Sequence, residues 1–208
     1  MSDEKTVLYY VHDPMCSWCW GFRPVWQEVK QALQNEVKID YLVGGLAPDS
    51  TEAMPLELQQ KLAQTWRTIE EKIPGTRFNF DFWQQCSPRR STYPACRAVL
   101  IAKQAAPELE EAMIYAIQKA YYEQARNPSD DDTLIALAIE LGLGGAWFAE
   151  QLHAPETEQL LQRDFDFARS LGGQGFPSLI LRQGGDSIFI PHSYTDVAET
   201  LRRIHQYL

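Results

Sequence analysis

Two cysteines separated by two residues, Cys16 and Cys19, lie near the start of this 208-residue sequence. On a helix this spacing places both sulfur atoms within one turn, where they can close a small disulfide ring. The residues before the pair, 6–12, are β-branched and aromatic without clean alternation, which is typical of a strand buried on both faces. After the pair, apolar residues recur at helical spacing as far as Leu33. The pattern predicts a strand followed by a helix that begins at the cysteine pair.

The place of each cysteine in this helix predicts its role. Unpaired backbone N–H groups and the helix dipole stabilise a thiolate at a helix N-terminus, so Cys16 is the expected nucleophile. Cys19 lies further into the helix and is expected to resolve the mixed disulfide. Trp18, between the two, is expected to be exposed and to contact the substrate. His12 and Asp13 are close in sequence but stay outside the predicted catalytic set. The motif is thus interpreted as a thiol–disulfide exchange centre.

Metal binding is the main alternative function of such a cysteine pair. Structural zinc sites usually bring a second closely spaced pair, whereas Cys86 and Cys96 are widely separated, and the histidines are scattered along the chain. We therefore predict neither a metal site nor a cofactor. Cys96 is expected to be a small buried residue on a helix face, with Cys86 outside the mechanism. The sequence leaves open whether these two form a second redox pair.

The rest of the chain indicates how the cysteine pair is held. Apolar and polar residues alternate over 36–43, which predicts a second strand. Two short runs, 178–182 and 187–190, predict a hairpin. The apolar residues of a last predicted helix are Val197, Leu201, Ile204 and Leu208. Helical patterns fill the interval between, at 58–73, 92–107, from 107 onward, 129–142 and 155–173. The expected fold is α/β, with one sheet domain (1–47 and 174–208) interrupted by a large all-helical insertion (48–173).

Composition excludes several classes of function. The formal net charge of -9 does not favour binding to nucleic acid or anionic lipid. No run approaches the roughly 18 apolar residues of a membrane span. The polar, charged start lacks the features of a signal peptide, so a cytoplasmic location is expected, where thiols are kept reduced.

The stretch Asp13-Pro14-Met15-Cys16-Ser17-Trp18-Cys19-Trp20-Gly21-Phe22, the helical insertion, and Gly175-Phe176-Pro177-Ser178 before a strand resemble the DsbA family of thioredoxin-like proteins. Within that family the chain looks most similar to the cytoplasmic FrnE-like branch. The resemblance implies a thioredoxin-like fold, dithiol–disulfide exchange at Cys16 and Cys19, and a cis peptide bond before Pro177. The residue before such a proline can pair through its backbone with a substrate strand, so Phe176 and Pro177 are expected substrate contacts.

The expected function is therefore disulfide exchange with protein or small-molecule thiols, glutathione among them. One alternative is a glutathione-dependent transferase or isomerase similar to the kappa class, in which serine would stand at the position of Cys16. Another is a non-catalytic metal-binding or interaction module. The direction of exchange, the substrate and the oligomeric state do not follow from the sequence.

Overall fold

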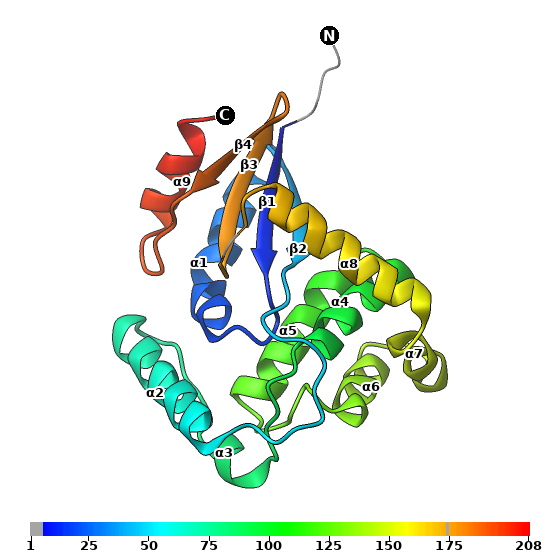
Figure 1. Cartoon of the computed structure of the whole chain (residues 1–208). Coiled ribbons are helices and arrows are strands. Elements are labelled where there is room, and N and C mark those ends of the chain that lie inside the picture. The colour runs from blue at the N-terminus through cyan, green and yellow to red at the C-terminus, as the bar shows by residue number, and fades with distance from the viewer. Residues whose placement is uncertain (1–5, 174) are drawn as a thin grey trace.

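The computed structural model describes residues 6–173 and 175–208 (Figure 1). Residues 1–5 and residue 174, where the predicted boundary between insertion and sheet domain falls, lie outside the described part. The elements in chain order are β1 (Val7–His12), α1 (Ser17–Leu33), β2 (Lys38–Val43), α2 (Leu56–Lys72), α3 (Phe82–Gln85), α4 (Tyr93–Ala105), α5 (Leu109–Tyr122), α6 (Asp131–Glu140), α7 (Gly145–Leu152), α8 (Pro155–Ser170), β3 (Ser178–Gln183), β4 (Asp186–Ile190) and α9 (Val197–His205).

The strands form one mixed sheet in the order β2-β1-β3-β4. β1 pairs in parallel with β2 and antiparallel with β3, so it has a neighbour on each side. β3 and β4 form the predicted hairpin. The α/β class and the strand–helix–strand order predicted from the sequence are confirmed.

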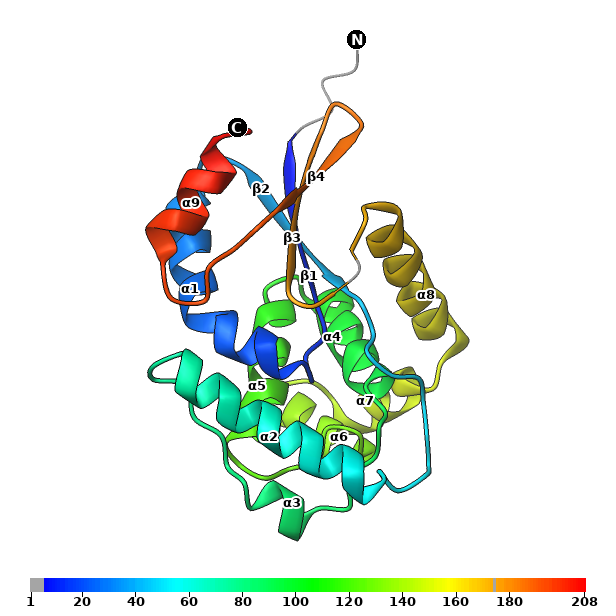
Figure 2. The same cartoon turned by 60° about the vertical axis from the view of Figure 1, so that its left-hand side comes forward.

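Helices cover both faces of the sheet, which explains why β1 lacks alternating polarity. Figure 2 shows α1 and α9 on one side of the sheet and α8 on the other. Leu8 and Tyr10 join the main core with α1, whereas Val11 packs in a smaller cluster with Ala168 and Leu171 at the end of α8. The division into a sheet domain and an insertion stays a proposal, and α8, which that division assigns to the insertion, packs on the sheet.

The other helices of the interval 48–173 pack against the end of the sheet where α1 begins (Figure 1). Trp20 of α1 stacks on Tyr122 of α5, with ring centroids 5.8 Å apart. Tyr122 in turn meets the buried ring of Trp66 of α2 at 5.5 Å. Helices α2 and α5 therefore pack beside the start of α1, where the cysteine motif lies.

Helix α7 was not predicted, and the last helix ends at His205 rather than including Leu208. α7 begins at Gly145, directly after Gly142 and Gly144, and such a density of glycine is typical of a turn. Among the described residues, none of the helices is long and apolar enough to cross a membrane.

Candidate active site

Cys16 occupies the N-cap position of α1, directly before the first helical residue. Its backbone is extended, and its N–H donates to the carbonyl oxygen of Asp13 at 2.9 Å, which closes a tight turn after β1. The first N–H groups of a helix have no partner inside the helix, and with the helix dipole they favour negative charge at this end. Cys16 therefore lies at the N-terminus of a helix, the position that the sequence predicted for it.

Cys19 lies one turn further along α1 and is fully buried, whereas 6% of Cys16 is exposed. Burial raises the pKa of Cys19 well above its ordinary value, and the Cys16 thiol and the charge of Asp13 raise this pKa further. Both residues are free thiols. The pair thus consists of an outer thiol at the helix end and an inner thiol that keeps its proton until it reacts.

A distant loop completes the surroundings of Cys16. The Phe176–Pro177 peptide bond is cis, which confirms the expectation drawn from the family resemblance. The Cys16 thiol donates a hydrogen bond to the carbonyl oxygen of Phe176 at 3.4 Å. Ser178 at the start of β3 donates its hydroxyl to the Gly175 carbonyl oxygen at 2.7 Å, which holds the turn. The backbone of Phe176 therefore lies directly beside the outer sulfur.

The ring of Phe176 packs on the backbone of Gly44, at the end of β2. A Cβ atom at Gly44 would come within 1.8 Å of a Phe176 ring carbon, so only glycine leaves room for the ring. The N–H of Gly44 donates to the carbonyl oxygen of His12 at 2.7 Å, which ties this backbone to the end of β1. Gly44, directly after β2, is thus a positioning residue for the loop beside Cys16.

Replacing Gly44 with alanine is expected to push Phe176 away from Cys16. Such overpacking costs about 1–3 kcal/mol in the free energy of unfolding, and exchange at Cys16 should slow because the neighbouring carbonyl group moves. Urea unfolding and the rate of the Cys16 reaction with oxidised glutathione measure the two effects. Gly175→Ala is the matched control, since a Cβ there meets nothing within 4 Å. Equal behaviour of the two variants would contradict the role of Gly44.

Trp18, predicted to be exposed, is half-buried. Its ring meets the edge of Tyr194, with centroids 5.2 Å apart. Tyr194 comes from the connection between β4 and α9, so the two rings bring α1 and the C-terminal segment together beside the cysteine pair. Contact between Trp18 and a substrate stays a proposal.

Asp13, left outside the predicted catalytic set, is fully buried and joins the turn before Cys16 to residues further along the chain. Its carboxylate accepts hydrogen bonds from the Met15 N–H at 2.7 Å, the Leu46 N–H at 2.7 Å and the Thr92 hydroxyl at 2.6 Å. Burial raises the pKa of Asp13, and these hydrogen bonds oppose the rise. The sequence does not indicate the two distant partners, Leu46 from the segment after β2 and Thr92 at the N-cap of α4.

His12 is fully buried and its ring stacks on Tyr10, with centroids 5.4 Å apart. Neither ring nitrogen has a hydrogen-bond partner among the described residues. Burial lowers the pKa of His12 to about 3, and the positive charge of Lys103 contributes to this shift. The imidazole is therefore neutral near pH 7 and does not supply a positive charge to stabilise the Cys16 thiolate.

Cys86 and Cys96 are free thiols that face different acceptors. The Cys86 thiol, partly exposed after α3, donates to the Ala125 carbonyl oxygen at 3.0 Å. The Cys96 thiol, fully buried in α4, lies 3.6 Å from a carboxylate oxygen of Asp13. Cys96 is thus the small buried helix residue that the sequence predicted.

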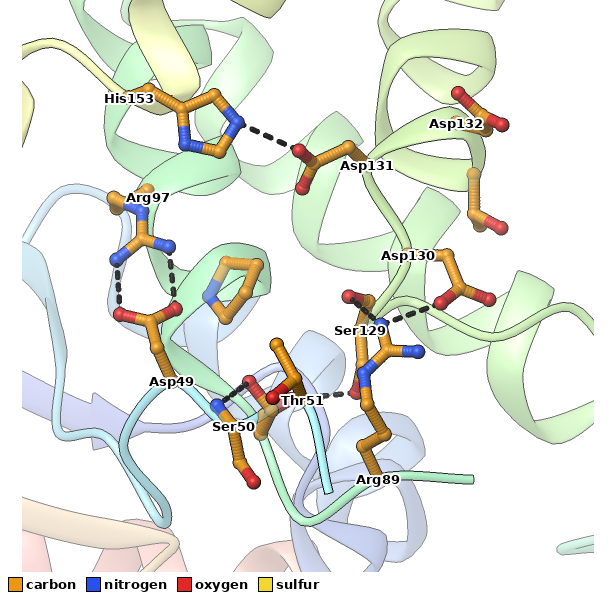
Figure 3. A pocket seen from close by; sticks show the side chains of 13 residues that line it. Asp49, Ser50, Thr51, Arg89, Arg97, Ser129, Asp130, Asp131, Asp132 and His153 are labelled. Carbon is orange, nitrogen blue, oxygen red and sulfur yellow. Dashed lines mark hydrogen bonds and ion pairs between the residues drawn. The ribbon is translucent and has the colours of Figure 1, made fainter. Parts of the chain in front are cut away.

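A polar hollow of about 590 Å³ lies among residues of the interval 48–173 and is lined by no cysteine (Figure 3). Several of its charged groups are paired with one another. Arg97 binds both carboxylate oxygens of Asp49 at 2.6 and 2.9 Å, and His153 contacts Asp131 at 2.7 Å. In the described part of the chain no cluster of histidine, cysteine and acidic residues is suited to hold a metal ion.

Three comparisons with known proteins bear on this site. Residues 7–201 match the family model of the DSBA-like thioredoxin domain. A solved structure from Nitrosomonas europaea, assigned as a protein disulfide isomerase, shares 28% identity and a TM-score of 0.85, with 98% of each chain covered. The cytosolic disulfide reductase DsbM from Pseudomonas aeruginosa shares 24% identity and a TM-score of 0.75, with 96% of each chain covered.

Curated relatives are more distant. The ClpXP adapter protein SpxH of Halalkalibacterium halodurans is 23% identical over 181 residues, which are 83% of this chain and 57% of the relative. The chain spans less than two thirds of the length of the curated relatives that it matches. The family model and the solved structures confirm the predicted thioredoxin-like fold, and the finer FrnE-like placement stays a prediction. The chain belongs to the DSBA-like thioredoxin domain family.

Proposed function

We propose that this protein exchanges disulfides with protein or small-molecule thiols, with Cys16 as the nucleophile and Cys19 as the resolving thiol. The observation that carries the proposal is the arrangement around Cys16, which combines a helix N-terminus with the Phe176 carbonyl oxygen 3.4 Å from its sulfur. The fold of the family supports a thiol–disulfide oxidoreductase in general. The two residue roles are the finer part of the proposal.

The reaction has two steps. The Cys16 thiolate attacks a substrate disulfide, forms a mixed disulfide and releases one substrate sulfur as a thiolate. Cys19 then loses its proton and attacks the Cys16 sulfur, which closes the Cys16–Cys19 disulfide and releases the second substrate thiolate. The substrate is reduced by two electrons and the protein is oxidised by two. The reverse sequence oxidises a dithiol substrate.

Phe176 is the proposed backbone contact for the substrate, with Pro177 shaping the loop and Trp18 on the other side of Cys16. One similar protein, DsbM, is a cytosolic disulfide reductase and has been solved with glutathione. By this similarity we propose that glutathione or protein thiols are the partners and that the protein works in the cytoplasm as a reductant.

Equilibration with glutathione redox buffers tests the function and its direction. The fraction of protein carrying the Cys16–Cys19 disulfide, measured by mass spectrometry after alkylation, gives the reduction potential. By the similarity to the cytosolic disulfide reductase DsbM, we expect a value nearer the about −270 mV of thioredoxin than the about −120 mV of DsbA. Protein that never acquires this disulfide in any buffer would contradict the proposed function.

A further inference from the structure

A narrow cavity reaches the inner thiol from between α1 and α5. It is lined by Tyr10, Cys19, Arg23, Tyr41, Glu111 and Gln118, among others, whereas Cys16 does not line it. Its volume of about 10 Å³ is room for about one water molecule. Arg23 and Glu111 are partly exposed, so the outer end meets solvent while the inner end is the fully buried Cys19.

The polar groups of this cavity form a path from the sulfur to the surface. Tyr10 is 3% exposed and lies beside Cys19 at the inner end. The side-chain oxygen of Gln118, a residue that is 2% exposed, has no partner among the residues described. The Tyr41 hydroxyl accepts a hydrogen bond from the Trp26 ring N–H at 2.9 Å. At the outer end, Glu111 forms an ion pair with Lys30.

The resolving step of the proposed reaction needs such a path. Cys19 must lose a proton before it can attack the mixed disulfide, since the thiolate is the nucleophile. Its side chain has no exposed surface, and burial raises its pKa. During this step the substrate bound to Cys16 covers the Cys16 side of the cysteine pair. Water therefore cannot reach Cys19 directly from that side.

We propose that the cavity is the proton route of Cys19 and that the Tyr10 hydroxyl relays the proton between the Cys19 sulfur and a water molecule held by Gln118. This inference rests on the proposed function. Burial, then the charges of Cys19 and Cys16, raise the pKa of Tyr10. Tyr10 therefore stays protonated and acts as a relay rather than as a base.

Atoms and charges balance in the relay. The S–H bond of Cys19 breaks first, and the Cys16–Cys19 bond then forms as the bond between Cys16 and the substrate sulfur breaks. The Tyr10 oxygen accepts the Cys19 proton while its own proton passes to the cavity water and then to solvent beside Glu111. Tyr10 ends neutral, and the substrate sulfur leaves with the electron pair of its former bond.

Tyr10→Phe tests the relay in a single turnover with oxidised glutathione. The glutathione adduct at Cys16 should form at the wild-type rate, because Tyr10 lies at the inner end of the cavity, which Cys16 does not line. Its decay to the Cys16–Cys19 disulfide should slow by roughly tenfold or more, at the low end of general acid–base effects. Acid-quenched samples analysed by mass spectrometry give both rates. Gln118→Leu should also slow only the decay.

Tyr9→Phe is the matched control, because the neighbouring tyrosine lies on the opposite face of β1 against Phe167, at 5.2 Å. Decay of the adduct within twofold of the wild-type rate in both Tyr10→Phe and Gln118→Leu would overturn the relay, since the leaving thiolate would then take the proton directly. Equal slowing of formation and decay would overturn it as well. A wild-type protein that forms no adduct at Cys16 would instead refute the proposed function.

Discussion

Replacing Cys16 with serine is expected to reduce thiol–disulfide exchange to background, whereas replacing Cys19 with serine should leave an attacking thiol that accumulates mixed disulfides. The difference follows from position, since Cys16 is at the helix N-terminus beside Phe176 and Cys19 is buried behind it. Without the Cys19 sulfur, only an external thiol can release the substrate. Insulin reduction measures turnover, and intact-protein mass spectrometry detects the trapped adduct.

Cys86→Ala is the control for this pair of variants. The Cys86 thiol donates to the Ala125 carbonyl oxygen and does not contact the motif, so this variant should keep most of the exchange activity. Adduct accumulation in the Cys16→Ser variant rather than in the Cys19→Ser variant would reverse the assigned roles. A Cys86→Ala variant that folds normally but has lost turnover would make a second thiol part of the mechanism.

The parts of this site that could be predicted are those encoded locally. The run of β-branched and aromatic residues before Cys16 and the helical spacing after it specify a strand and a helix over a short stretch of chain. That context places one cysteine at the helix end and the other a turn inside. The cis bond before Pro177 came from the family resemblance and not from local pattern, since an X–Pro bond is more often trans.

The parts that could not be predicted depend on contacts between distant segments. Nothing near Gly44 indicates that the ring of Phe176 will lie on it. From the sequence, Tyr10 is an ordinary core residue of a buried strand. Only the packing of α5 against α1 shows that Tyr10 shares a cavity with Cys19. Tertiary packing, which single-sequence patterns do not encode, decides both positions.

Asp13 is another residue whose distant partners the sequence does not indicate. Its replacement is the second change for which we expect a large effect. Each oxygen of its buried carboxylate faces a donor, the Met15 N–H on one side and the Leu46 N–H and Thr92 hydroxyl on the other. An asparagine has one acceptor oxygen and one NH2 group, so in either orientation the NH2 group faces a buried donor. Since an unsatisfied buried donor costs about 1–3 kcal/mol, and more where a charged partner is lost, Asp13→Asn should lower the free energy of unfolding by about 2–4 kcal/mol.

Urea unfolding monitored by tryptophan fluorescence measures this change in the free energy of unfolding. Asp186→Asn, at an exposed position in β4, is the control and should change it by less than about 0.5 kcal/mol. Because Leu46 lies beyond β2 and Thr92 is at the N-terminus of α4, loss of the Asp13 carboxylate should also loosen the contact of these two segments with the turn before Cys16. Backbone amides of Met15 and Leu46 should then exchange with deuterium faster in Asp13→Asn than in Asp186→Asn. Two variants with the same stability and the same exchange at these amides would show that the buried carboxylate does not hold the turn before Cys16 to Leu46 and Thr92.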